Sequence, residues 1–506
     1  MVIAMTKYHN PILSGFYPDP SICRVGNTFY MVTSSFEYFP SVPIFKSENL
    51  VNWTQIGHCI TQENYLKLEH CRNSGGIYAP TLRYHNGVFY MITTDISGIR
   101  NFFVTATDPA GPWSRPVLVD LPGIDPSIYF EDDKMFCSST SKMVNGKQHI
   151  VIAQVDPVTG ECLTPQYQLW EGTGGRFPEG AHLYKKDGWY YLLLAEGGTA
   201  MGHMVTMARS KTLLGPYQPC TRNPVFTHRD IVNTTIQGTG HMDLVDDTRG
   251  NWWAVFLGFR ITEHYFHHIG RETFLAPVSW ATGDFPVIND GRPVQLEMDA
   301  DDLPLPVSPV HRDFVDDFRH SDLHMRYNFL RASRPVPFQI DNGLLLRGNG
   351  TDLDECGTPS FIGFRQAALS CTVFCTLSAE LTSRSRAGIT VFYDNTRHFD
   401  LFVMGNEVQV RKRFDDFCQV SYRAKRTADT LTLMIRTDGI LYQFGWGQTR
   451  EEAESNVVAQ GYARHLSTEA GIMSFTGVYI GMFVDEGTED IACFQKLEYR
   501  ESAILS

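Results

Sequence analysis

The stretch DPSICRVGNTFYMVTSS, residues 19–35, decides the fold, because its pattern recurs along the chain. Each copy has a polar or small pair, an apolar strand, a turn of Gly, Asn or Asp residues, and a strand of alternating aromatic and aliphatic residues. The starts of the copies lie 46 to 61 residues apart, which leaves room for two further strands per copy. The other copies are APTLRYHNGVFYMITTD (79–95), DPSIYFEDDKMFCSSTS (125–141), EGAHLYKKDGWYYLLLAE (179–196) and GHMDLVDDTRGNWWAVFLG (240–258).

Five units of four strands at this spacing predict a five-bladed β-propeller in the first part of the chain. In such a ring the first strand of each blade lines the central channel, so equivalent residues face one another across the axis. We expect these positions to hold Asp19, Ala79, Asp125, Glu179 and, one residue into the last copy, His241. The alternative is that the acids only form turns, which Asp does well but Glu and Ala do not.

The second part of the chain predicts a β-sandwich. Runs such as AGITVFYDNTRHFDLFVMG (387–405) and LTLMIRTDGILYQFGWG (431–447) have the alternation of hairpin strands. An acidic, Pro-rich segment precedes them and is typical of a surface linker. We therefore expect an all-β protein that consists of a propeller (1–295), a linker (296–312) and a sandwich (313–506).

Bulk composition excludes several classes of partner. The formal net charge of −13 would repel nucleic acid, and no apolar run is long enough to span a membrane. The eleven Cys residues are scattered, without the spacing of a zinc site or a disulfide framework. These features predict a cytoplasmic protein that acts on small or neutral substrates.

Three carboxyl groups that converge on one funnel suit glycoside hydrolysis. That reaction needs one carboxyl group protonated, to assist the leaving group, and one ionised. A third acid can raise the pKa of the proton donor by like-charge repulsion. The chain has no GxSxG elbow and no Walker loop, so acyl and phosphoryl transfer lack their usual parts. Neither a metal nor a nucleotide is required.

Six segments, in order, make the chain resemble glycoside hydrolase family 43, a family of inverting enzymes with a five-bladed propeller. They are NPILSGFYPDPSI (10–22), GGIYAPTLRYH (75–85), GIDPSIYFEDD (123–133), FPEGAHLYKKDGWYYLLLAEGG (177–198), GTGHMDLV (238–245) and GRETFLAPV (270–278). The resemblance implies that Asp19 is the general base and Glu179 the general acid. It also implies that Asp125 tunes the pKa of the acid and orients the substrate.

The same resemblance implies that Phe36, Tyr78, His241 and Arg271 contact the substrate. His241 would lie on the propeller axis, where it could hold a structural calcium, another cation or a water molecule. Three of these residues have a structural alternative: Phe36 and His241 could belong to the core, and Arg271 could form an ion pair with Glu272.

The His-rich run HYFHHIG, residues 264–270, resembles a metal-binding cluster. No carboxylate or Cys stands at ligand spacing beside it. We therefore expect a solvated loop near the rim of the funnel.

The resemblance favours an exo-acting α-L-arabinofuranosidase that works on arabinoxylan-derived oligosaccharides. A β-1,4-xylosidase, or a dual enzyme that acts on xylo-oligosaccharides, is the close alternative, and a non-catalytic sugar-binding propeller is the alternative of another class. The segment FTGVYIGMFV (475–484) resembles the concanavalin-like C-terminal sandwich of such enzymes. That domain often packs against the propeller and narrows the funnel mouth, unless it is a carbohydrate-binding module or a plain stabilising domain. Two-domain proteins of this kind often form homo-oligomers.

Overall fold

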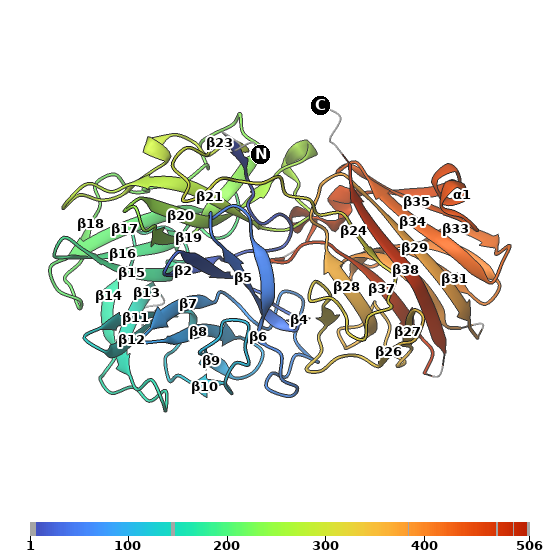
Figure 1. Ribbon diagram of the computed structural model, residues 1–506, viewed down its shortest axis with the longest axis horizontal. Helices are drawn as coiled ribbons and strands as arrows, with labels where there is room; N and C mark the ends of the chain where they lie inside the picture. The colour runs from blue at the N-terminus through green and yellow to red at the C-terminus, as the bar shows by residue number, and fades with distance from the viewer. Residues whose placement is uncertain (1–6, 143–146, 383, 472–473, 489, 503–506) are drawn as a thin grey trace.

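The computed structural model describes residues 7–142, 147–382, 384–471, 474–488 and 490–502. Five small sheets from the first part of the described chain lie beside two large sheets from the second part (Figure 1). Strands dominate throughout, which confirms the all-β prediction. The helices of the described residues are α1 (Arg450–Ser455) and the single-turn η1 (Glu263–Tyr265), η2 (Asn289–Gly291), η3 (Ala463–Leu466) and η4 (Thr468–Ala470). None of these described helices has the length and apolar character that crossing a membrane requires.

Each sequence repeat forms the first hairpin of one four-stranded antiparallel sheet. In the described chain these sheets are β2 (Ser21–Val25), β3 (Thr28–Val32), β5 (Ser41–Ser47) and β6 (Thr54–Ile60); β7 (Thr81–His85), β8 (Val88–Asp95), β9 (Arg100–Ala106) and β10 (Val117–Leu118); β11 (Ile124–Glu131), β12 (Lys134–Lys142), β13 (Gln148–Val155) and β14 (Tyr167–Trp170); β15 (Glu179–Lys186), β16 (Trp189–Glu196), β17 (Met204–Ser210) and β18 (Gln218–Pro219); and β19 (Ile236–Asp246), β20 (Trp252–Arg260), β21 (Glu272–Ser279) and β22 (Val287–Ile288).

The first strands of the five sheets form a closed ring. Strand β2 contacts β7, β7 contacts β11, β11 contacts β15, β15 contacts β19, and β19 returns to β2. Three of the five hairpins that place these strands have two-residue turns with positive φ at both central residues, which are Asn86-Gly87, Asp132-Asp133 and Asp187-Gly188. Such turns match the natural twist of the strands that they join. The ring therefore brings the starts of the five repeats together.

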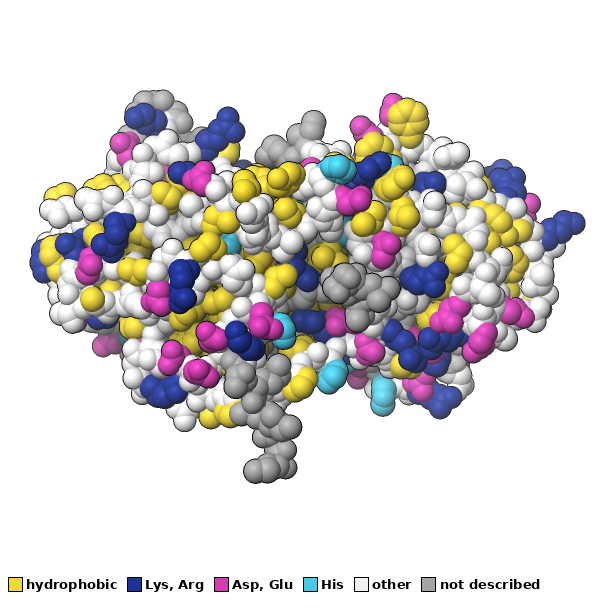
Figure 2. All heavy atoms as spheres, turned by 90° about the horizontal axis from the view of Figure 1, so that it is seen from above, with side chains coloured by type: hydrophobic (Ala, Val, Ile, Leu, Met, Phe, Trp, Pro, Cys, Tyr) yellow, Lys and Arg dark blue, Asp and Glu magenta, His cyan; other side chains and the backbone are white. Residues whose placement is uncertain are grey.

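The second part of the chain folds into the predicted two-sheet sandwich. One sheet contains β24 (Phe314–Asp316), β26 (Phe338–Ile340), β27 (Leu344–Arg347), β29 (Cys371–Glu380), β34 (Thr430–Thr437), β35 (Leu441–Gly447), β36 (Val457–Tyr462) and β38 (Ile491–Glu501). The other contains β28 (Ser360–Arg365), β30 (Arg386–Asp394), β31 (Arg397–Met404), β32 (Glu407–Phe414), β33 (Phe417–Lys425) and β37 (Tyr479–Asp485). On the face drawn in Figure 2, basic and acidic side chains are interspersed over both halves of the molecule.

The segment predicted as a linker is tied to the first part of the chain. Its strand β23 (Glu297–Asp299) pairs with the N-terminal strand β1 (Lys7–His9). Further along, the side chain of Asn49 donates a hydrogen bond to the carbonyl of Pro306 (2.9 Å), and Val307 is buried against the propeller core. Most residues of the segment are exposed, and it is held against the propeller by a strand pair and a buried apolar side chain.

The two halves share a tightly packed interface. Strand β4 (Tyr38–Phe39) of the first half pairs with β25 (Phe329–Leu330) of the second. The rings of Tyr38 and Tyr479 stack with their centroids 3.8 Å apart. At Gly477 the backbones themselves meet, because a Cβ atom there would lie 2.4 Å from the carbonyl oxygen of Ile269. The segment on either side of Gly477 is therefore fixed against the first half of the chain.

The prediction of a solvated loop for the HYFHHIG run is wrong for most of its length. His267 and His268 are buried. The ring of His267 stacks on Phe259, and its Nδ1 lies 2.6 Å from a carboxylate oxygen of Glu469, which comes from the second half of the chain. The acid was missing from the local sequence because the fold supplies it from about 200 residues away. The run is part of the interface.

We predict that Gly477→Ala loosens this interface. The added methyl group overlaps the Ile269 carbonyl, and overpacking of this kind costs about 1–3 kcal/mol of folding free energy. Differential scanning calorimetry should show a lower unfolding midpoint. Gly202→Ala is the control, because the nearest atom to its new Cβ would be 3.7 Å away. Equal unfolding midpoints for the two variants would contradict the backbone contact.

Candidate active site

Three of the five first strands have a β-bulge where they enter the ring. A β-bulge interrupts β11 between Ile124 and Ser127, β15 between Glu179 and His182, and β19 between Gly240 and Asp243. The first bulged residues, Asp125, Gly180 and His241, all have positive φ (52°, 59° and 47°). Asp19, at the equivalent place before β2, has a φ of 55°. Positive φ is strained for residues other than Gly, and such strain is typical of functional sites.

The expected equivalence of Glu179 with Asp19 and Asp125 is wrong by one residue. The bulge register places Gly180 at the shared position and Glu179 just before it. The physical reason lies in His241, because a Cβ atom on Gly180 would lie 2.9 Å from the His241 ring. A Gly at this position makes room for the imidazole, and Glu179 reaches the axis from the neighbouring position.

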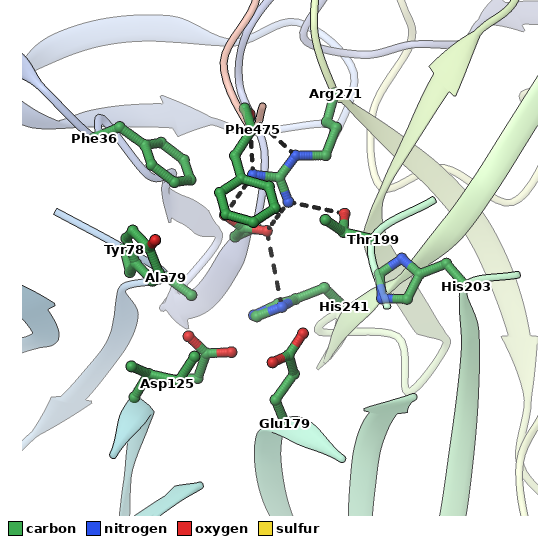
Figure 3. A pocket seen from close by; sticks show the side chains of 12 residues that line it. Phe36, Tyr78, Ala79, Asp125, Glu179, Thr199, His203, His241, Arg271 and Phe475 are labelled. Atoms are coloured by element: carbon green, nitrogen blue, oxygen red, sulfur yellow. Dashed lines mark hydrogen bonds and ion pairs between the residues drawn. The ribbon is translucent and has the colours of Figure 1, made fainter. Parts of the chain in front are cut away.

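The ring encloses one end of a pocket with about 440 Å³ of empty space. The structure brings all seven residues predicted for the site into its lining, as Figure 3 shows for most of them. The lining residues are Asp19, Phe36, Tyr78, Ala79, Ile124, Asp125, Glu179, Thr199, His203, His241, Arg271 and Phe475.

Asp19 is held in its ionised form. Arg271 donates from Nη1 to one carboxylate oxygen (3.0 Å), and the Ser34 hydroxyl donates to the other (2.5 Å). His241 Nδ1 lies 3.8 Å from the first oxygen. Burial alone would raise the pKa of Asp19, but Arg271, His241 and the Ser34 hydrogen bond outweigh it and lower the pKa below the ordinary value.

The pKa values of Asp125 and Glu179 are shifted upward, opposite to that of Asp19. Burial and the Asp19 charge raise the pKa of Asp125 to about 6, against the opposing effects of His241 and Arg271. Burial, followed by the charges of Asp125 and Asp19, raises the pKa of Glu179 well above its ordinary value. One pocket therefore holds an ionised carboxylate and a protonated carboxyl group, which is the pairing that acid–base catalysis needs.

Arg271 connects three parts of the site. Besides Asp19, it donates from Nη1 to the Thr199 hydroxyl (3.0 Å) and from Nη2 to the backbone carbonyl of Phe475 (3.2 Å). The alternative of an Arg271–Glu272 ion pair is wrong, because Glu272 pairs with Arg260 (2.8 Å). Arg271 therefore fixes the geometry of Asp19 through contacts to both halves of the chain.

Three aromatic rings form one wall of the pocket. The centroid of Phe36 lies 5.1 Å from that of Tyr78 and 6.0 Å from that of Phe475. The Tyr78 hydroxyl donates to the carbonyl of Ser74 (3.2 Å), and the Ser74 hydroxyl accepts from the backbone N–H of Phe475 (2.8 Å). Burial raises the pKa of Tyr78 to about 12, so its hydroxyl stays protonated and can serve as a donor. Phe36 is both a core residue and a wall residue.

Sequence reasoning missed four lining residues. Phe475 begins the segment FTGVYIGMFV (475–484), which resembles the C-terminal sandwich of the family. No local pattern indicates that its side chain reaches the pocket from the second half of the chain. Thr199 follows the quoted LLLAEGG run and has no motif of its own. Ile124 begins the same β-bulge as Asp125. The ring of His203 lies against Gly240, because a Cβ atom on Gly240 would be 2.4 Å from that ring. Burial, with His241 and Arg271 nearby, lowers the pKa of His203 to about 3, so it is neutral.

The described residues contain no group of three or more His, Cys, Asp or Glu side chains arranged to hold a metal ion. His241 Nδ1 lies 3.8 Å from a carboxylate oxygen of Asp19, and the His241 ring lies against Gly180. The predicted axial cation has no further support from this geometry and stays a prediction.

Comparison with family models identifies both halves. Residues 8–286 match the model for glycosyl hydrolases family 43, and residues 315–500 match the beta xylosidase C-terminal concanavalin A-like domain. The chain belongs to glycosyl hydrolase family 43 and is therefore a glycoside hydrolase. The alternative of a non-catalytic sugar-binding propeller is wrong.

Individual relatives extend over most of the chain. A non-reducing end alpha-L-arabinofuranosidase of Bacteroides ovatus, BoGH43B, is 37% identical over 497 residues, covering 95% of this chain and 92% of the relative. A xylosidase/arabinosidase of Butyrivibrio fibrisolvens is 41% identical over 423 residues, covering 80% of each chain. Both halves thus have counterparts joined in the same order.

Solved structures agree with this assignment. The structure titled Bacteroides ovatus xyloglucan PUL GH43B superposes with a TM-score of 0.91 at 35% identity, covering 98% of this chain and all of the other. A xylan beta-1,4-xylosidase from Bacillus halodurans C-125 superposes with a TM-score of 0.91 at 31% identity, with the same coverage. The arrangement of the propeller beside the sandwich is therefore shared with both of these structures.

We predict that Gly180→Ala disturbs the pocket more than a comparable Gly→Ala change elsewhere. Gly180 and Gly188 both have positive φ (59° and 72°), so each substitution carries a similar backbone penalty of about 1–2 kcal/mol. Only at Gly180 does the new methyl group also meet the His241 ring, since no atom lies within 4 Å of a Cβ at Gly188.

Chemical denaturation of the two variants measures the difference. Gly180→Ala should lose more unfolding free energy than Gly188→Ala, and it should also lose hydrolytic activity because His241 no longer supports Asp19. If both variants lose the same stability and keep full activity, the packing account of the shared position is wrong.

Proposed function

We propose that this chain is an inverting exo-glycosidase that releases terminal α-L-arabinofuranosyl residues from arabinoxylan-derived oligosaccharides. One observation carries the proposal: the pKa of Asp19 is lowered and that of Glu179 is raised within the same pocket. The assignment of the sugar is supported by the arabinofuranosidase and xylosidase/arabinosidase names of the relatives.

In the proposed reaction Asp19 removes a proton from the water molecule that attacks the anomeric carbon. Glu179 gives its proton to the glycosidic oxygen as the bond to the leaving sugar breaks. The Asp125 charge favours the protonated form of Glu179 before the reaction, while Arg271 and His241 favour the ionised form of Asp19. After one turnover Asp19 is protonated and Glu179 is ionised, so both exchange protons with solvent before the next.

The shape of the site supports release of single terminal sugars. The ring of first strands lies at one end of the pocket, and Phe475 from the second half joins Phe36 and Tyr78 in the wall. In the proposed reaction a chain of sugars enters this pocket by its end. Phe36, Tyr78, His241 and Arg271 are the residues that we assign to substrate binding.

A β-1,4-xylosidase, alone or combined with the arabinofuranosidase activity, is the second candidate. It is supported by the family description of the C-terminal domain and by the xylosidase name of the Bacillus halodurans structure. Assays with para-nitrophenyl α-L-arabinofuranoside and para-nitrophenyl β-D-xylopyranoside, followed by singly substituted arabinoxylo-oligosaccharides, separate the two. Faster release of xylose from the whole set would overturn the arabinose assignment.

We also propose the finer architecture. Each four-stranded sheet is one blade of a five-bladed propeller over residues 1–295, followed by the linker at 296–312 and the sandwich at 313–506. A cytoplasmic location, a homo-oligomer and an axial cation at His241 stay predictions, and none of them enters the proposed reaction.

We predict that Glu179→Ala and Asp19→Ala have different signatures. Loss of the acid should slow hydrolysis of natural oligosaccharides by about 10²–10⁴-fold, but much less for aryl glycosides whose leaving groups need no proton. Loss of the base should abolish both reactions. Glu454→Gln, a change of an acid on the distant helix α1, is the control. Proton NMR of the first-formed sugar should show inversion, and a retained anomer would remove the assignment.

We predict that Asp125→Asn moves the alkaline limb of the pH profile. Activity requires Asp19 ionised, which holds above its lowered pKa, and Glu179 protonated, which holds below its raised pKa. The Asp125 charge is one cause of the raised Glu179 pKa, so its removal should shift the alkaline limb of kcat/KM toward lower pH. A limb that stays in place, or moves upward, would contradict the electrostatic role of Asp125.

A further inference from the structure

The connection that leads into Glu179 is held by an acid that the proposed reaction does not use. Glu196 is fully buried at the end of β16. It accepts hydrogen bonds from the backbone N–H groups of Thr173 (2.9 Å) and Gly175 (3.0 Å), from the Thr173 hydroxyl (3.0 Å) and from the Thr206 hydroxyl (2.6 Å). Four donors on one carboxylate give the connection between β14 and β15 a defined shape.

That shape presents a large aromatic side chain to solvent. Phe177 is 50% exposed, although burial is the usual state of such a ring. Its φ of 53° is a strained value for a bulky residue, and strain of this kind persists only where surrounding contacts impose it. The contacts are visible: Gly197 donates from its backbone to the carbonyl of Arg176 (2.7 Å), and the Phe177 ring lies 3.1 Å from where a Cβ of Gly198 would stand.

The position of the ring relative to the pocket follows from its neighbours along the chain. Phe177 is two residues before Glu179, and Gly198, against which it packs, is one residue before Thr199. Both Glu179 and Thr199 line the pocket, whereas Phe177 does not. Between them Pro178 is buried, and its carbonyl accepts a hydrogen bond from the Thr140 hydroxyl (3.2 Å). The exposed ring is therefore fixed just outside the pocket, next to the proposed general acid.

We propose that Phe177 is the platform on which the leaving-group sugar stacks. The inference rests on the proposed function, in which Glu179 protonates the oxygen between the terminal pentose and the next sugar. A residue that adjoins Glu179 on the outer side then adjoins that next sugar. One face of a pyranose ring carries C–H groups, and such a face packs on the negatively polarised face of an aromatic ring. The platform selects a pyranose, such as the xylose of an arabinoxylan backbone, as the leaving group.

The test compares two substrates that differ only beyond the scissile bond. One is a xylo-oligosaccharide with a single terminal arabinofuranosyl branch, and the other is methyl α-L-arabinofuranoside, whose leaving group has no ring. For Phe177→Ala, the ratio of kcat/KM on the first to kcat/KM on the second should fall about three- to tenfold, mainly through KM. Phe177→Trp should restore the ratio.

Phe417→Ala is the matched control, because Phe417 is a 73% exposed aromatic on strand β33 of the sandwich. A ratio that is unchanged in Phe177→Ala, or equally changed in Phe417→Ala, would overturn the platform. Calorimetric titration of xylotriose into Glu179→Ala, with and without Phe177→Ala, gives a second readout that needs no turnover. If the wild type hydrolyses neither pentoside, the proposed function is wrong. The platform is then tested by binding alone: weaker binding of xylotriose by Phe177→Ala supports it, and equal binding contradicts it.

Discussion

The ion pair between Arg271 and Asp19 is the interaction on which the rest of the site depends. Both side chains are buried, and removal of one partner from such a pair leaves an uncompensated charge that costs about 3–5 kcal/mol. The pair keeps one carboxylate ionised at the axis of the ring. Burial, together with the field of that carboxylate, raises the pKa of Asp125 and Glu179. Arg271 thus keeps Asp19 ionised, while burial and like-charge repulsion favour the protonated forms of Asp125 and Glu179.

The same arginine explains why the second domain belongs to the site. Its guanidinium donates to the Phe475 carbonyl, and Phe475 is held close to Gly477, where the two backbones touch. The Glu469–His267 pair is a second contact between the two halves. The wall of the pocket is therefore a product of domain docking. A change in the interface would reach Asp19 through Arg271 without any change in the propeller itself.

Much of this could be predicted from the sequence, because the hairpin repeat is local and its turns and alternation are visible in single strands. The three acids could be placed in one pocket because repetition implies a ring. The one-residue offset of Glu179 could not be predicted, since it arises from β-bulges that make room for His241 across the axis. The roles of Phe475 and Glu469 could not be predicted for a different reason. Each residue contacts a partner about 200 or more residues away in the sequence, and no local pattern encodes such a contact.

The central claim is that Asp19 and Glu179 have opposite protonation states in the resting protein. Isotope-edited NMR of side-chain carboxyl carbons, with Asp19→Asn and Glu179→Gln used to assign the signals, observes these states directly. The account predicts that near neutral pH the Glu179 signal has the chemical shift of a protonated acid while the Asp19 signal has that of a carboxylate. Two ionised carboxylates at that pH, or a protonated Asp19, would contradict it.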